Sequence, residues 1–307
     1  MNRFLDKLMA YKPAIFIDQL LYRIDEDRVV ATGAQLTFSL ILSIFPFIIV
    51  FLNILTYTPL VRLEVLNELI FYLPIETQKI ITDFTLEIAK TSSQGLLSIA
   101  AILGLWTASS GIQAVIRAIN MAYDFKEKRS FVRLRIMSLI FTLGLMVLIT
   151  LVFLTLVFGD LVTDKIFAII DSEFLMNLWG YLRLSIPILY MILIFALLYK
   201  FSPCKNKKYR ISIISVLPGA IFTSLGWLGI SKLFSYYVNN FGRYAITYGS
   251  LVGIILLLIW LYISSIIIVL GGEINATLEY FKIFGFKWNK NKSLIANMSH
   301  IDSTPGS

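Results

Sequence analysis

Residues 251–270 read LVGIILLLIWLYISSIIIVL and contain no charged side chain. About 20 apolar residues in an α-helix, rising 1.5 Å each, cross the roughly 30 Å hydrocarbon layer of a bilayer. The stretch follows Tyr248-Gly249-Ser250 and precedes Gly271-Gly272-Glu273-Ile274-Asn275-Ala276. The sequence therefore predicts a membrane-spanning helix that ends at the Gly271-Gly272 pair, with Glu273 as the nearest carboxylate.

The composition of the whole chain points to the same class of protein. Of its 307 residues 58% are hydrophobic and only 15% are charged, and the mean hydropathy is +0.80. A soluble protein of this length needs a more polar surface. One Cys and one His leave no disulfide pair and little material for a transition-metal site, so we expect no cofactor. Residues 1–28 mix acids and bases without an apolar core, which does not fit a cleavable signal peptide.

Apolar stretches of spanning length recur along the chain and predict an all-α polytopic membrane protein with six transmembrane helices plus amphipathic surface helices. Residues 1–28 are expected to lie at the membrane surface, 29–280 to form the membrane domain, and 281–307 to be a polar, disordered tail. Residues 57–94 predict two amphipathic helices separated by Pro74, and residues 159–183 a loop with a short helix. The six spans are expected at residues 29–56, 95–116, 136–158, 184–199, 211–231 and 248–272.

The distribution of cations predicts the orientation. The amino-terminal segment, the second and fourth loops and the carboxyl tail carry 20 of the 27 Lys and Arg residues, and the alternate loops carry 7. Cytoplasmic loops are enriched in Lys and Arg, so both termini are expected in the cytosol. On this assignment every cation lies outside the spans.

Two groups of polar residues interrupt the spans. In the first span Gln35, Ser39 and Ser43 are four apart and share a helix face, with Asn53 farther on; in the second, Ser109, Ser110 and Gln113 form another cluster. The first stripe is predicted to face the bundle interior, because an amide facing hydrocarbon is costly. Either group can line a polar pathway; the alternative is hydrogen bonding between helices or tight packing.

Arg117 and Glu273 are the charges nearest to the spans, and both are expected at the cytosolic boundary. A pairing of the two would set the register of two helices or form a gate, and Asn120 and Asn275 lie close enough in sequence to join it. The alternative is that lipid headgroups solvate each charge separately. The absence of charge from every span core argues against tight coupling to an ion gradient.

A further set of residues marks helix bends or close contacts. Proline removes a backbone donor and bends a helix, and glycine lets two helices approach closely. Both are common in membrane helices, so ordinary packing is the alternative to a hinge. The candidates are Pro46, Gly104, Gly111, Pro218, Gly219, Gly249 and Gly253.

The basic loop with Lys126, Lys128, Arg129, Arg133 and Arg135 is compatible with nucleic acid or with a membrane surface. Anionic lipid headgroups attract each such cation by about 1 kcal/mol. A nuclease needs carboxylates for metal ions or residues for acid–base chemistry, and the single His lies in the polar tail. We therefore expect membrane lipids as partners, no nucleic acid, and no enzymatic activity.

Three motifs together resemble a known family. They are Trp106-Thr107-Ala108-Ser109-Ser110-Gly111 with Arg117-Ala118-Ile119-Asn120, then Pro218-Gly219-Ala220, then the stretch from Tyr248 to Ala276. In order and spacing they resemble the YihY/BrkB family of bacterial inner-membrane proteins, members of which were once mislabelled ribonuclease BN. The resemblance runs from about Val29 to Tyr280. It implies a multi-pass protein of the bacterial inner membrane and an association with the cell envelope.

Two functions of different classes agree with these features. One is transport or translocation of an amphipathic, lipid-like envelope molecule, for which the polar stripes and uncharged interior argue. The other is a non-transporting scaffold or assembly factor that docks a second copy of the chain or an envelope protein on its basic loops and amphipathic segments. A membrane-bound nuclease is disfavoured.

Overall fold

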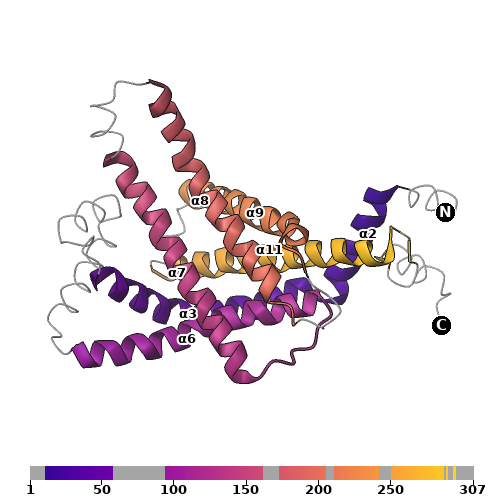
Figure 1. Ribbon diagram of the computed structural model, residues 1–307, viewed down its shortest axis with the longest axis horizontal. Coiled ribbons are helices and arrows are strands. Elements are labelled where there is room, and N and C mark those ends of the chain that lie inside the picture. Colours follow the sequence, from indigo (N-terminus) through magenta and orange to yellow (C-terminus); the bar gives the residue numbers. More distant parts are fainter. Residues whose placement is uncertain are drawn as a thin grey trace. The chain divides into compact units, whose positions relative to one another are not determined.

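The computed structural model describes residues 11–57, 94–161, 173–204, 211–241, 250–286, 288–289 and 293–294 (Figure 1). Within these residues all regular structure is helical, and no strand occurs, as predicted. The amphipathic helices expected within residues 57–94 fall almost wholly outside the described part. The helices are α2 (Lys12–Glu26), α3 (Val29–Tyr57), α6 (Gln94–Ala122), α7 (Phe131–Leu161), α8 (Glu173–Phe201), α9 (Ile213–Phe241) and α11 (Ser250–Phe284).

Five of these helices are long and apolar enough to cross a membrane, by length and composition. Their apolar segments are Ile102–Ala122, Phe131–Leu151, Trp179–Phe201, Ile213–Tyr237 and Gly253–Phe284. The corresponding segment of α3, Val29–Ile44, is shorter. Within the described residues the structure thus establishes five helices able to cross a membrane, where the sequence predicted six.

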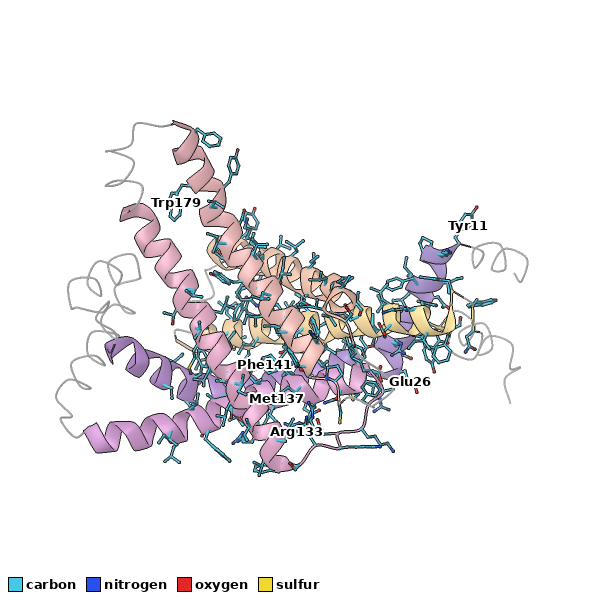
Figure 2. All side chains as sticks on the ribbon, viewed as in Figure 1. Tyr11, Glu26, Arg133, Met137, Phe141 and Trp179 are labelled. Carbon is cyan, nitrogen blue, oxygen red and sulfur yellow. The ribbon has the colours of Figure 1, made fainter. Side chains whose placement is uncertain are left out.

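The helices extend beyond the predicted spans, and this corrects two expectations. Helix α11 continues through Gly271-Gly272 to Phe284, so the glycine pair does not end it. Helix α7 begins at Phe131, so Arg133 and Arg135 belong to a spanning helix and not to a loop. Figure 2 labels Arg133, Met137 and Phe141, which are four residues apart and share one face of α7. A spanning helix can carry cations near its end because their charged heads reach the polar interface.

The chain divides into two compact units, and each is described by itself. The first contains residues 1–41, 113–134 and 188–307; the second contains residues 42–112 and 135–187. Both candidate sites considered below lie within the first unit.

The core of the first unit is the contact between α9 and α11. A Cβ atom on Gly219 would overlap the carbonyl oxygen of Gly271, and one on Gly271 would overlap the side-chain oxygens of Thr223 and Tyr199. The Tyr199 hydroxyl, from α8, lies 2.7 Å from Thr223 Oγ1 and donates to the Ile268 carbonyl at 2.7 Å. Glycine is therefore needed at position 271 for close approach of two backbones, which is the physical reason that α11 continues where the sequence suggested an end.

Pro218 lies inside α9 and cannot donate a backbone hydrogen bond. Asn275 of α11 forms two hydrogen bonds with the α9 backbone on either side of Pro218. Its Oδ1 accepts from the Gly219 N–H at 2.8 Å, and its Nδ2 donates to the Val216 carbonyl at 3.1 Å. The Pro218-Gly219 pair is thus held by a neighbouring helix.

Helix α2 packs on the carboxyl-terminal end of α11. Ile15 and Phe281 are both buried and form a small apolar cluster with flanking aromatic residues. Asp18 accepts a hydrogen bond from Trp288 Nε1 at 3.2 Å, which joins α2 to residues beyond α11. Helix α2 therefore packs against the rest of the first unit through its buried face.

In the second unit α3 and α6 approach closely. A Cβ atom on Gly104 would lie 2.6 Å from Val50 Cγ2, and the Pro46 carbonyl is also near. The guanidinium of Arg135 stacks over the Trp106 ring, with its carbon 3.9 Å from the ring centroid. The buried cation near the start of α7 is thus accommodated by an aromatic face.

Candidate functional site

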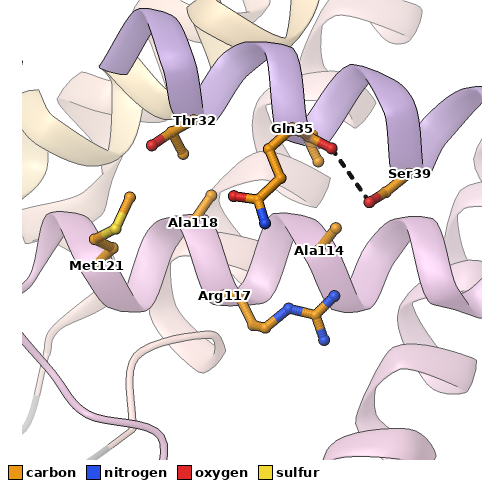
Figure 3. A pocket seen from close by; sticks show the side chains of 8 residues that line it. Thr32, Gln35, Ser39, Ala114, Arg117, Ala118 and Met121 are labelled. Carbon is orange, nitrogen blue, oxygen red and sulfur yellow. Dashed lines mark hydrogen bonds between the residues drawn. The ribbon is translucent and has the colours of Figure 1, made fainter. Parts of the chain in front are cut away.

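A cavity of about 150 Å³ lies between α3 and α6 in the first unit (Figure 3). Helix α3 contributes Thr32, Gln35, Leu36 and Ser39, and α6 contributes Ala114, Arg117, Ala118 and Met121. Three of the polar residues singled out in the sequence, Gln35, Ser39 and Arg117, therefore line one cavity.

Small residues on α6 make room for the cavity. Ala114 and Ala118 are one turn apart and buried, so neither fills the space opposite α3. Figure 3 shows the Gln35 side chain extending from α3 toward the helix that carries these two alanines. Any larger side chain at either alanine position would occupy the space that Gln35 enters.

Two hydrogen-bonding groups in the cavity are available to a ligand. Arg117 is exposed, and its Nη1 donates to Gln113 Oε1 at 3.3 Å; within the described residues its other N–H groups have no partner. Gln35 is also exposed, and its side-chain amide has no hydrogen bond within the same residues. By contrast the hydroxyls of Thr32 and Ser39 donate to backbone carbonyls, those of Asp27 at 3.2 Å and Gln35 at 3.3 Å.

Apolar side chains accompany the polar ones. Leu36 and Met121 line the cavity; Leu36 is buried and Met121 is 40% exposed. Phe38, on the same helix as Gln35, is 65% exposed. The arrangement places a cation and an amide beside large exposed apolar side chains, which suits a molecule with a polar head and an apolar tail.

The prediction that Gln35, Ser39 and Ser43 all face the bundle interior is wrong in part. Ser43 is buried and Ser39 half-buried, but Gln35 is exposed. The residue of α3 that bonds to α11 is Thr37, whose Oγ1 lies 3.1 Å from Ser265 Oγ. The side chain of Asn53 lies outside the described residues.

The cluster predicted in α6 is mostly satisfied within its own helix. Ser109 Oγ donates to the Trp106 carbonyl at 2.8 Å, and Ser110 Oγ donates to the Thr107 carbonyl at 2.5 Å. Gln113 is buried and holds Arg117. Such back-bonding needs no partner on another helix, so Ser109 and Ser110 give no support to a polar pathway.

The hypothesised pair of Arg117 and Glu273 does not form. Glu273 is completely buried, and the charges that act on it are those of Asp27, Arg23 and Asp124. Arg117 is exposed on α6 and bonds to Gln113. The two residues therefore interact with different partners.

Asn120 and Asn275 also lie in separate networks. Asn120 Nδ2 donates to Glu127 Oε2 at 3.0 Å, and its Oδ1 accepts from the Cys204 N–H at 2.6 Å. Glu127 accepts from Arg129 Nε at 2.7 Å, and Arg129 Nη2 donates to the Ser202 carbonyl at 2.7 Å. The network ties the turn after α6 to the end of α8, and the Arg129 hydrogen bond is the main cause that lowers the pKa of Glu127.

The candidate hinge and packing residues fall into three groups. Pro46, Gly104, Pro218 and Gly219 lie at close helix contacts, and Gly111 is buried in α6. Gly253 has open space around it, which does not support a packing role within one chain. Gly249 lies outside the described residues.

Sequence reasoning missed Arg23 and Asp27 as site residues. Arg23 is buried, its Nη1 donates to the Ala122 carbonyl at 3.0 Å at the end of α6, and its Nη2 lies 3.6 Å from Asp124 Oδ2. No spacing rule links residue 23 to residue 122. Nor does any spacing rule link Asp27 to a neighbour on α11.

The chain was compared with known proteins. The family model for virulence factor BrkB matches residues 20–292. The chain belongs to the BrkB family. This confirms the resemblance deduced from the three sequence motifs.

Relatives from several bacteria cover nearly the whole chain. The ribonuclease-like protein YfkH of Bacillus subtilis is 38% identical over 268 residues, which are 86% of this chain and 95% of that protein. A UPF0761 membrane protein of Pseudoalteromonas atlantica is 25% identical over 287 residues, 90% of each chain. One from Haemophilus influenzae is 26% identical over 268 residues, 84% of this chain and 92% of the relative. No solved structure matches the chain significantly.

The ribonuclease-like name applies to one relative and finds no support in the geometry of this BrkB-family chain. Among the described residues no group of three or more His, Cys, Asp or Glu side chains is placed to hold a metal ion. What the comparisons establish is a membrane protein of the BrkB/UPF0761 family.

Proposed function

We propose that this protein translocates an amphipathic, lipid-like molecule of the bacterial envelope and is not an enzyme. The observation that carries the proposal is the cavity between α3 and α6. There, among the described residues, the Gln35 amide and the Arg117 N–H groups other than that of Nη1 have no hydrogen-bond partner, and exposed apolar side chains lie beside them. Arginine presents a planar fork of donors that matches phosphoryl oxygens. The head of the bound molecule is therefore a phosphate ester, and its acyl chains lie along Phe38.

The proposed setting is the inner membrane, crossed six times, with both termini in the cytosol. Helix α3 supplies the sixth span: it has 29 residues, and at about 1.5 Å per residue it exceeds a bilayer's hydrocarbon thickness. With the amino terminus in the cytosol, α6 runs from the outer side toward the cytosol and reaches the cytosolic boundary of the membrane near Arg117. The cavity then meets the headgroups of the cytosolic leaflet, where anionic lipids are within reach.

The test is translocation of a fluorescent phosphatidylglycerol in vesicles that contain the purified protein, measured by the fraction of probe accessible to an impermeant quencher. Wild-type protein is expected to move the probe faster than empty vesicles. Arg117→Gln is expected to slow it about tenfold or more, because a hydrogen bond to a charged group contributes about 1.5–3 kcal/mol.

The control is Arg133→Gln, which removes an exposed cation of α7 that does not line the cavity. Its rate should equal that of wild type. A wild-type rate no greater than that of empty vesicles would refute translocation and favour the scaffold function. Equal slowing by both variants would refute a specific role for the cavity and leave only a general effect of positive charge.

A further inference from the structure

Glu273 is the only residue in the described part of the chain with two carboxylate oxygens that are both buried and without a hydrogen-bond donor. Its side chain is completely buried in α11, and neither oxygen accepts from any N–H or hydroxyl group of the described residues. An ionised carboxylate in such a place loses its hydration without compensation. A group of this kind is retained only with a partner that supplies a proton or a positive charge.

Among the side chains whose charges act on Glu273, a second carboxyl group, that of Asp27, has the largest effect. Asp27 is fixed in the turn between α2 and α3. Its N–H donates to the Arg23 carbonyl at 2.9 Å, its own carbonyl accepts from Thr32 Oγ1, and the next residue, Arg28, has a φ of 47°. The turn thus holds the Asp27 carboxyl against α11.

Among the described residues the cation whose charge acts on both carboxyl groups is Arg23, and its hydrogen bonds are directed elsewhere. Arg23 donates to the Ala122 carbonyl and approaches Asp124, whose side chain is 66% exposed. One guanidinium against three carboxyl groups leaves the cluster short of positive charge. The other titratable groups nearby are Tyr123 at the end of α6, Tyr199 of α8 and Glu279 of α11.

These phenols and carboxyl groups supply no positive charge. Burial raises the pKa of Tyr123, so this phenol stays neutral in the accessible pH range. Burial, and then the negative charge of Asp124, raises the pKa of Asp27. The shortage of positive charge is therefore met from solution.

We propose that Asp27 and Glu273 form a proton-binding site, in which one proton is shared between the two carboxyl groups. Two carboxyl groups hydrogen-bond to one another only when one of them carries a proton. The proton comes from water on the side where Asp124 is exposed; one O–H bond forms at a carboxylate oxygen, and the reverse step releases the proton to water. Neither Asp27 nor Glu273 is among the residues that line the cavity between α3 and α6.

The proposal revises what the sequence suggested about ion coupling. An uncharged span core argued against it, because the charges were expected in the open boundary. The structure instead buries Glu273 within the apolar segment Gly253–Phe284 and places a second carboxyl group against it. Intramembrane carboxyl groups of this kind commonly bind protons in transport proteins.

The experiment is infrared difference spectroscopy of the full-length protein in lipid nanodiscs, titrated with acid and base. A protonated carboxyl group has a carbonyl stretch that carboxylates lack, and carbon-13 labelling of glutamate or aspartate identifies its residue type. Wild-type protein is expected to show this absorption near neutral pH and to lose it on addition of base. Glu273→Gln and Asp27→Asn are each expected to abolish or shift it.

Glu26→Gln is the matched control, because Glu26 is an exposed carboxylate next to Asp27 and should leave the absorption unchanged. Asp27→Asn also keeps the test decisive if Glu273→Gln does not fold. Absence of the absorption at every pH, or its persistence unchanged in both variants, would overturn the proposal. Its loss on addition of sodium at constant pH would also overturn it, in favour of a metal-cation site.

Discussion

Replacement of Gly271 by alanine tests the claim that close approach, and not helix termination, is the reason for the glycine pair in α11. The added Cβ would overlap the hydroxyl oxygens of Thr223 and Tyr199 and would lie 2.9 Å from the Gly219 carbonyl oxygen. These are rigid or buried groups, so α9 and α11 must move apart. Gly272→Ala is the ideal control, because its Cβ would meet Ala122 Cβ at 3.6 Å, an ordinary contact.

The magnitude follows from three contributions. Overpacking in a core costs about 1–3 kcal/mol. The two hydrogen bonds of the Tyr199 hydroxyl, to Thr223 and Ile268, contribute about 1 kcal/mol each and are lost when α9 and α11 separate. Alanine favours a helix over glycine by up to about 1 kcal/mol. We therefore expect Gly271→Ala to lower the free energy of unfolding by about 2–4 kcal/mol.

The assay is reversible denaturant unfolding in mixed micelles, followed by tryptophan fluorescence. Gly272→Ala should be neutral or slightly stabilising, since it gains helix propensity without a clash. Adding Thr223→Ala to Gly271→Ala should restore part of the lost stability, because it removes one of the overlapping oxygens. If Gly271→Ala and Gly272→Ala have equal stability, the two backbones do not approach as closely as the structure shows, and the reasoning fails.

Two further predictions concern the loops and the topology. In Glu127→Gln the amide proton of Cys204 should exchange with solvent faster than in wild type at neutral pH. In wild type the protection of this amide should fall only on acidification. The reason is that a carboxylate with a lowered pKa stabilises the folded turn above that pKa and no longer does so once it is protonated. Equal protection of the Cys204 amide in wild type and Glu127→Gln at all pH values would contradict this prediction. In a Cys204→Ser background, single cysteines at Ser303 and Thr91 should react with impermeant reagents from opposite sides of the membrane, and reaction of both from outside would disprove cytosolic termini.

The helices could be predicted from the sequence because the bilayer imposes a simple length requirement. A run such as residues 251–270 has few alternatives to a spanning helix, whatever it packs against. Helix ends were harder to predict, since a glycine pair is equally compatible with a terminus and with a close contact. At Gly271 the choice depends on Tyr199 and Thr223, which come from two other helices.

The sites were only partly predictable, because sequence indicates the depth of a residue in a membrane helix but not which neighbour it faces. The proposed pairing of Arg117 and Glu273 was wrong because each helix presents its charge to a different partner. Gln35 was recognised as important, but its exposure could not be known before α3 was placed beside Ala114 and Ala118.

The two proposed sites meet in the first turn of α3. Thr32 lines the cavity, and its hydroxyl donates to the carbonyl of Asp27, the residue that faces Glu273. The first turn of α3 therefore carries a wall of the ligand cavity and is hydrogen-bonded to Asp27, which belongs to the proposed proton site. Linkage makes the consequence reciprocal: a ligand that prefers one position of this turn changes the proton affinity of the carboxyl pair, and protonation changes the affinity for the ligand by the same factor. A proton and an amphipathic ligand can thus be coupled, because the first turn of α3 lines the cavity and bonds to Asp27.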